Sequence, residues 1–291
     1  MRDLFGYQGK RVVITGAASG MAQAVARLLV ELGAEVYALD RNEVTVPVKQ
    51  YIKVDLLHKD SIDAAVEQIP DNLYALFNCA GTGNPPLSAL DVTLINFVGH
   101  RHLTESLLPK MSDGGAIAFI SSQGGIAWRS NLDTINKLLA TRGFDEARAW
   151  LEANEEVNSG YIFSKQCICA YAKTRAEELA KRNIRINCIL PGNTETGLTP
   201  QFLEDGTVVS QGAVVPQLSG EAGKAAADII REFLDMSNGL NGRPATAEEQ
   251  AEPLVFLNSN MARFISGENL VVDFGCIANI EVGRDPDLFG L

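Results

Sequence analysis

Two side chains that could move a proton stand four residues apart, at Tyr161 and Lys165. On a helix this spacing places both on one face, one turn from each other. An ammonium held there can lower the pKa of the phenol, which suits an acid/base that protonates or deprotonates an alcohol. The spacing alone also occurs by chance, so its meaning depends on the other chemistry that the chain carries.

A glycine-rich turn at residues 15–22 is typical of nucleotide binding. Gly16 permits a tight turn, Gly20 lets the backbone approach a pyrophosphate, and the N-terminus of the following helix favours anions. Asp40 follows ~20 residues later, where a carboxylate accepts hydrogen bonds from ribose hydroxyls. Asp40 therefore predicts NAD as the cofactor, although Arg41 beside it could accommodate the 2′-phosphate of NADP.

Apolar, strand-like runs alternate with amphipathic stretches, which is the pattern of βαβ units around a parallel sheet. The predicted strands cover residues 11–15, 35–39, 51–54, 73–77, 116–120, 184–190 and 269–273. The predicted helices cover residues 21–32, 61–69 (capped by Ser61), 94–111, 160–181 and 247–257. The sequence therefore predicts an α/β fold: a three-layer, Rossmann-like, doubly wound parallel sheet of about seven strands, in a single domain over residues 1–291.

Two stretches exceed what this alternation requires. Residues 128–159 show helical periodicity on both sides of Gly143, which predicts a helical hairpin inserted before the Tyr161 helix. Residues 196–243 are punctuated by glycines and have a helical pattern over 222–236. Because long loops in compact domains are usually functional, we expect this second stretch to be a substrate lid.

The composition is that of a globular protein with excess negative charge. Of its 291 residues 46% are hydrophobic, and the formal net charge is -11, so nucleic acid and anionic membranes are not expected partners. The five cysteines are scattered, and His58, His100 and His102 lack metal-ligand spacing. We therefore expect reduced thiols, histidines that serve as surface or packing residues, and no metal. Without an apolar leader or a run of about 18 apolar residues, a cytoplasmic location is expected.

With these marks in order, the chain resembles the short-chain dehydrogenase/reductase family over nearly its whole length. The further motifs that carry the resemblance are Asp55-Leu56, Asn78-Cys79-Ala80-Gly81, Asn96, Ser121-Ser122, Pro191-Gly192 with Thr196, Ile265-Ser266-Gly267 and Val272-Asp273-Phe274-Gly275. The long spacing between Ser122 and Tyr161 is similar to that of a subgroup with bacterial 3α-hydroxysteroid dehydrogenases and coniferyl-alcohol dehydrogenases.

The resemblance implies an NAD-dependent alcohol dehydrogenase or ketone reductase, with NADP the less favoured cofactor. Tyr161 would be the acid/base, Lys165 would lower its pKa and bind the nicotinamide ribose, and Ser122 would bind the substrate oxygen. Asn96 would lie at a helix distortion and hold a water in a proton relay. With Tyr161 and Lys165, the cofactor contacts implied are Gly16, Ser19, Gly20, Met21, Asp40, Arg41, Asp55 at the adenine, Leu56, Asn78, Ala80, Gly81, Pro191, Gly192, Thr194 and Thr196 at the carboxamide.

The substrate class stays open between two alternatives. The subgroup resemblance favours a hydroxysteroid or a similar bulky apolar alcohol or ketone, with coniferyl-type aromatic alcohols as the alternative. A catalytically silent NAD-binding regulator is a more remote alternative, because such proteins usually lose the Tyr or the Lys. The insertion precedes the helix through which the family's subunits commonly pair. The resemblance therefore implies a homodimer or other homo-oligomer with an altered interface at the Tyr161 helix.

Overall fold

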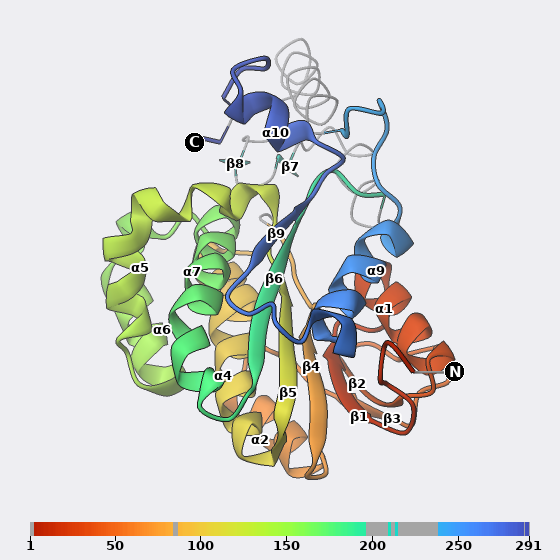
Figure 1. The fold of residues 1–291 in the computed structure, drawn as a ribbon. Helices are drawn as coiled ribbons and strands as arrows, with labels where there is room; N and C mark the ends of the chain where they lie inside the picture. The colour runs from red at the N-terminus through yellow and green to blue at the C-terminus, as the bar shows by residue number, and fades with distance from the viewer. Residues whose placement is uncertain are drawn as a thin grey trace.

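A seven-stranded parallel sheet forms the centre of the protein, in the order β3-β2-β1-β4-β5-β6-β9 (Figure 1). The computed structural model describes residues 3–83, 87–195, 238–287 and 289–290, together with the backbone of 209–210 and 213–214. The strands are β1 (Arg11–Thr15), β2 (Glu35–Asp40), β3 (Gln50–Lys53), β4 (Leu73–Asn78), β5 (Met111–Ile120), β6 (Arg185–Pro191) and β9 (Asn269–Val272). The predicted Rossmann-like sheet is confirmed, and β5 alone extends well beyond its predicted start.

Helices cover both faces of the sheet, which explains why the central strands are almost continuously apolar. One face is covered by α1 (Gly20–Glu31) and α9 (Ala247–Asn258), and the other by α2 (Lys59–Glu67), α4 (Gly99–Leu107) and α7 (Tyr161–Ala180). The strand order reverses between β1 and β4. In a doubly wound sheet, ligands bind at the carboxyl ends of the strands beside such a reversal.

Two details of the predicted helices differ from the structure. The helix expected at 94–111 begins earlier, at α3 (Ala89–Thr93), and continues through a π-helical turn (Leu94–Val98) into α4. It also ends earlier than expected, at Leu107, and Met111 is the first residue of β5. The π-helical turn inserts one extra residue per turn and contains Asn96. The prediction that Ser61 caps α2 is wrong, because the helix begins at Lys59 and the Ser61 hydroxyl accepts the Asp55 N–H at 2.9 Å.

The expected helical insertion is confirmed as α5 (Leu132–Leu139) and α6 (Gly143–Ala153), which lie against α4 and α7 (Figure 1). Both helices are amphipathic. Their buried side chains, which belong to the same core cluster as those of α4 and α7, are Ile135, Leu138, Phe144, Ala147 and Leu151. The insertion is therefore part of the hydrophobic core rather than an appendage.

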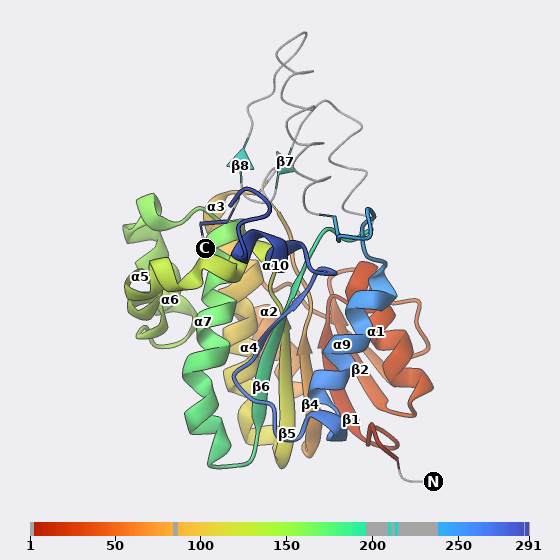
Figure 2. The same ribbon diagram turned by 45° about the horizontal axis from the view of Figure 1, so that its top comes forward.

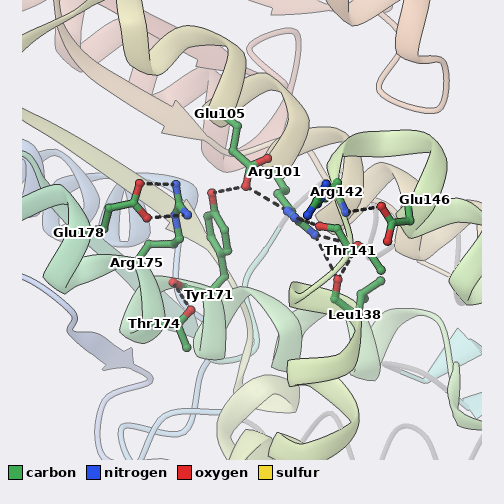
Figure 3. Close-up of polar contacts among 10 residues, drawn as sticks. All are labelled: Arg101, Glu105, Leu138, Thr141, Arg142, Glu146, Tyr171, Thr174, Arg175 and Glu178. Atoms are coloured by element: carbon green, nitrogen blue, oxygen red, sulfur yellow. Dashed lines mark hydrogen bonds and ion pairs between the residues drawn. The ribbon is translucent and has the colours of Figure 1, made fainter.

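A buried cation fixes the insertion to α4 (Figure 3). Arg101 donates from Nη1 to the Leu138 carbonyl at 3.2 Å and to the Thr141 hydroxyl at 3.1 Å, and from Nη2 to the Thr141 carbonyl. Its Nε donates to Glu105 Oε1 at 3.0 Å, an oxygen that also accepts from the Tyr171 hydroxyl at 3.5 Å. A cation is favourable here because the C-terminal carbonyls of a helix carry partial negative charge.

Most of the predicted lid, including the helical pattern over 222–236 and Thr196, lies outside the described residues. Two short antiparallel strands within it are β7 (Val209–Ser210) and β8 (Ala213–Val214). After β9 comes a helix that the sequence did not predict, α10 (Cys276–Glu281), at the carboxyl end of the sheet (Figure 2). Within the described residues, the 3₁₀ segments are Leu108–Lys110, Gln123–Asn131, Glu155–Val157 and Asn260–Ala262.

Candidate active site

The glycine turn after β1 lies against the turn that follows β4. Gly16 has φ +81°, and a Cβ added to it would stand 2.7 Å from the Cα of Ala80. A side chain cannot be accommodated at that distance, so the two backbones approach closely only because Gly16 has none. These two closely packed turns, just before the N-terminus of α1, form the Gly16 cradle.

Asp40 lies beside this turn at the end of β2. Its Oδ2 accepts the Ala18 N–H at 3.0 Å, and its Oδ1 accepts the Asn42 N–H at 2.9 Å. A carboxylate has further lone pairs, so these two contacts orient Asp40 and still leave it able to accept hydroxyl protons. Arg41 follows with an exposed side chain.

The hydroxyl of Thr15 joins the two turns from within. Thr15 Oγ1 accepts the N–H groups of Cys79 and Ala80, at 2.9 and 3.1 Å, and contacts Nε2 of His100 at 2.9 Å. Thr15 is fully buried. Sequence reasoning assigned it no role beyond its place in the glycine-rich turn.

Lys165 is almost fully buried, with 4% of its surface exposed, and its ammonium lies on the same side of α7 as the ring of Tyr161. Its Nζ donates to the Ile120 carbonyl at 2.9 Å and is 5.4 Å from the centroid of the Tyr161 ring. Burial lowers the pKa of Lys165 to about 8, because an apolar surrounding disfavours the charged form. The predicted placement of the two side chains on one helix face is confirmed.

The pKa of Tyr161 differs in direction from the sequence-based expectation. Burial raises it, and a hydrogen bond with Ser122 acts in the opposite direction. Desolvation of the phenolate therefore outweighs the stabilisation that neighbouring groups give it. At neutral pH the phenol keeps its proton.

The two serines after β5 have different partners. The Ser121 hydroxyl donates to the Lys165 carbonyl at 2.8 Å and contacts Cys169 Sγ at 3.2 Å. Ser122 is hydrogen-bonded to Tyr161, and its hydroxyl accepts the Gly124 N–H at 3.2 Å. Ser122 is thus the serine that shares a site with the phenol.

Asn96 is fully buried in the π-helical turn. Its amide donates to the Thr82 carbonyl at 2.9 Å and to the Ser164 hydroxyl at 3.2 Å, and its Oδ1 accepts the Thr82 N–H at 2.9 Å. A Cβ added to Gly81 would stand 3.6 Å from both Asn96 Oδ1 and Lys165 Nζ. The side chains of Asn96 and Lys165 therefore face a shared point beside Gly81.

The other predicted cofactor contacts differ from one another in burial and in bonding. Asn78 is buried, and its side-chain amide donates to the Thr104 hydroxyl of α4 at 3.0 Å. This amide therefore faces α4 in the interior. The Asp55 carboxylate accepts the Leu57 N–H at 3.0 Å. The side chain of Leu56 is buried. Ser19 stands at the N-cap of α1, one residue before Gly20 and two before Met21.

The carboxyl end of β6 completes the candidate site. Pro191 ends the strand, and a Cβ on Gly192 would stand 2.8 Å from Cβ of Asp273. Thr194 donates from its hydroxyl to the Gly192 carbonyl at 2.9 Å. In the parts of the chain that the structure describes, no group of three or more His, Cys, Asp or Glu residues is placed to hold a metal ion. Nor does any helix there have the length and apolar composition needed to cross a membrane.

Comparison with known proteins assigns this arrangement to a family. A model of the short chain dehydrogenase family matches residues 10–132 and 152–206, more than half of the chain. The chain belongs to the short-chain dehydrogenase/reductase family. Like the family, it is an oxidoreductase, and the interruption at 133–151 coincides with the insertion formed by α5 and α6.

Relatives of this short-chain dehydrogenase include the two kinds of enzyme that the sequence suggested. It is 32% identical to the coniferyl-alcohol dehydrogenase of Pseudomonas sp. (strain HR199 / DSM 7063), over 91% of this chain and 96% of that protein. It is 25% identical to the 3-alpha-hydroxysteroid dehydrogenase/carbonyl reductase of Comamonas testosteroni, over 91% and 95% respectively. The 3-alpha-hydroxysteroid dehydrogenase of Pseudomonas sp. B-0831, solved with NADH, superposes with a TM-score of 0.72 at 26% identity, covering 94% of this chain and 99% of that one.

His100 is the site residue that sequence reasoning judged differently. It was expected to be a surface or packing residue, and the structure places it at 1% exposure between Thr15 and Asn96. The available signal was its position four residues after Asn96, which puts the two on one helix face. His102 bonds to Asp63 at 2.7 Å, and His58 is the exposed N-cap of α2.

Proposed function

We propose that the protein is an NAD-dependent alcohol dehydrogenase that also catalyses the reverse carbonyl reduction. The observation that carries the proposal is the convergence of Tyr161, Ser122 and Lys165 at the carboxyl end of the sheet, beside the Gly16 cradle. A bound nicotinamide cofactor would supply the acceptor or donor of a hydride there. The chain's own groups would supply orientation and the proton.

Tyr161 is the proposed acid/base. In reduction its hydroxyl donates a proton to the substrate oxygen, while the Ser122 hydroxyl hydrogen-bonds the same oxygen as negative charge develops on it. Because burial raises the pKa of Tyr161, the phenol is protonated at neutral pH and suited to reduction. Alcohol oxidation requires the phenolate, so we expect its rate to increase as the pH rises above neutrality.

Lys165 and Asn96 are proposed to carry the proton between Tyr161 and solvent. The ammonium is held above the phenol ring by its bond to the Ile120 carbonyl. We place the relay water at the point beside Gly81 that both Lys165 Nζ and Asn96 Oδ1 face. The same ammonium would hydrogen-bond the nicotinamide ribose.

The cofactor is proposed to be NAD, with its adenosine ribose on Asp40. The carboxylate would accept the ribose hydroxyls and repel a 2′-phosphate. The other proposed contacts are Gly16, Ser19, Gly20, Met21, Arg41, Asp55, Leu56, Asn78, Ala80, Gly81, Pro191, Gly192, Thr194 and Thr196. We expect Asp40→Asn, which removes the charge but keeps the shape, to reduce the preference for NAD over NADP roughly tenfold. Glu43→Ala, at an exposed carboxylate three residues later, is the matched control.

We propose coniferyl-type aromatic alcohols as the first substrate class, ahead of the hydroxysteroids that the sequence analysis placed first. The support is the higher identity to the coniferyl-alcohol dehydrogenase, 32% against 25% for the hydroxysteroid relative over the same share of the chain. Hydroxysteroids remain the second candidate because the superposed structure is a 3-alpha-hydroxysteroid dehydrogenase.

An absorbance assay at the NADH band tests reaction, cofactor and substrate together. NAD and NADP are each offered with coniferyl alcohol, androsterone, bile acids and cyclic alcohols. We expect NADH to form fastest with coniferyl alcohol. Faster turnover of androsterone would reassign the substrate, and faster reduction of NADP would overturn the role of Asp40. No turnover with any alcohol, while NADH still binds, would favour the silent regulator.

We also propose that the protein is a homo-oligomer whose subunits do not pair through α7 in the usual way. The support is that the insertion packs on α4 and α7. We infer that it takes up surface that a second copy would need for pairing through α7. Light scattering, followed by a structure of the assembly, tests this. An assembly with α7 paired against α7 of a second copy would contradict it.

A further inference from the structure

His100 lies between the Gly16 cradle, which is the proposed cofactor cradle, and the π-helical turn. Each of its ring nitrogens has one polar partner. Nδ1 is 3.0 Å from the Asn96 carbonyl oxygen, and Nε2 is 2.9 Å from Thr15 Oγ1. The ring also packs edge-to-face on Phe119 of β5, with the centroids 6.4 Å apart. Contacts from three separate elements thus fix the position of a single imidazole.

The partners determine where the protons are. A carbonyl oxygen only accepts, so Nδ1 must carry a hydrogen and donate it to Asn96. Thr15 Oγ1 already accepts the N–H groups of Cys79 and Ala80, so its own proton is directed at Nε2. The ring is therefore neutral, with Nε2 as an acceptor. The neutral state agrees with the pKa of His100, which burial, the largest effect, lowers to about 4. The bond to the Asn96 carbonyl acts in the opposite direction, and the Lys165 ammonium adds to the lowering.

The bonds continue beyond His100 in both directions. On one side, Thr15 holds the turn at Cys79 and Ala80, against which Gly16 packs. On the other side, the Asn96 amide binds Ser164, whose hydroxyl donates to the Tyr161 carbonyl at 2.6 Å. One side chain thus connects the cofactor cradle with the helix that carries the proposed acid/base.

We propose that His100 is a positioning residue whose two nitrogens have separable effects: Nε2 positions the cofactor cradle through Thr15, and Nδ1 positions the proton relay through Asn96. The proposal rests on the oxidoreductase function proposed above. It predicts that losing one bond affects cofactor affinity, whereas losing the other affects turnover. A histidine that only stabilised the fold would affect both together, or neither.

Two substitutions separate the two bonds. Asn places an amide where Nδ1 stands, so His100→Asn keeps the donor to Asn96 and loses the acceptor for Thr15. Gln reaches the position of Nε2, so His100→Gln does the reverse. We expect His100→Asn to raise the dissociation constant for NADH roughly tenfold, with kcat within about threefold of wild type. For His100→Gln we expect the opposite pattern, a kcat roughly tenfold lower with NADH affinity nearly unchanged.

Two further variants keep the test decisive. Thr15→Val removes the bond to His100 together with the acceptor of the Cys79 and Ala80 N–H groups. It should therefore weaken NADH binding at least as much as His100→Asn, and it should also lower the melting temperature of the protein because two buried N–H groups lose their acceptor. His102→Gln, two residues along α4 and bonded to Asp63, should leave both quantities unchanged. NADH affinity is measured by fluorescence without substrate. Equal losses in both His100 variants, or none, would overturn the inference.

Spectroscopy gives a readout that does not depend on turnover. Long-range proton–nitrogen correlation spectra of the imidazoles should show the His100 ring protonated at Nδ1 and bare at Nε2 around neutral pH. A proton on Nε2 would overturn the inference even if the enzyme is active. If wild type turns over no alcohol while the spectra and NADH affinities behave as expected, the function proposed above fails and the positioning role stands.

Discussion

His100 and Arg101 are neighbours on α4, yet they serve two different parts of the molecule. His100 reaches the candidate active site, and Arg101 reaches the end of α5 in the insertion (Figure 3). Both side chains are buried and both bond to backbone carbonyls. The difference lies in what surrounds them. The insertion is held by buried apolar side chains and by the bonds of Arg101, whereas the candidate active site is a set of buried polar groups that bond one another.

This difference separates stability from activity. Around Lys165 the fold retains a buried ammonium whose pKa falls to about 8, which disfavours folding at neutral pH. In the insertion, the charge of Arg101 faces helix carbonyls and the Glu105 carboxylate, and apolar burial by Leu138 and Phe144 adds to the free energy of unfolding. We therefore expect substitutions at the site to change rates and substitutions at the insertion to change stability.

The largest expected effect is on rate. Tyr161→Phe removes only the hydroxyl that transfers the proton, so we expect turnover to fall about 10³-fold or more while NADH binding and the melting temperature stay near wild type. Steady-state kinetics and NADH fluorescence measure the two. Turnover within tenfold of wild type would show that Tyr161 is not the acid/base. The contrast between the active site and the insertion would then place activity at the wrong residue.

The next effect is on stability. Arg101→Leu leaves the Thr141 carbonyl without its buried donor, so we expect the free energy of unfolding to fall by roughly 3 kcal/mol with kcat little changed. Arg148→Leu is the matched control, because Arg148 forms an exposed ion pair with Glu152 on α6. Its loss should change the free energy of unfolding by less than about 0.5 kcal/mol. Urea denaturation measures both. A large loss of kcat in Arg101→Leu would mean that the insertion also shapes the site.

The smallest effect concerns the pH dependence of stability. The pKa of Lys165 is lowered from its ordinary value of 10.5 to about 8 in the folded protein, so between these values the unfolded chain binds more protons. Burying the charge lowers the free energy of unfolding at neutral pH. This loss becomes smaller as the pH rises through this range. Lys165→Met should be more stable than wild type at about pH 7, and its advantage should shrink by roughly 2 kcal/mol by about pH 9.5. An advantage that does not vary with pH would show that burial of the charge is not the cause.

The two regions also differed in how far sequence reasoning could describe them. The Tyr161–Lys165 pair, the glycine turn and the helical hairpin all follow from spacing within one segment, and their structures are as expected. The links between segments did not follow. No local pattern indicates that Thr15 contacts His100, or that Arg101 of α4 donates to the carbonyls at the end of α5. These pairs are joined only when distant elements pack. The direction of the Tyr161 pKa failed for the same reason, since burial depends on the whole fold.

By itself, the sequence determined the order along the chain of the seven sheet strands and of the main helices that cover them, the family, and the residue types available for chemistry. Periodicity and turn residues act over a few positions, and they are enough to specify a doubly wound sheet and to place Tyr161 one helical turn from Lys165. The tertiary structure alone decided which polar groups are desolvated and what each one bonds. It set the neutral state of His100, the lowered pKa of Lys165 and the partner of each serine after β5. Those properties depend on distances between segments that only the packed sheet brings together.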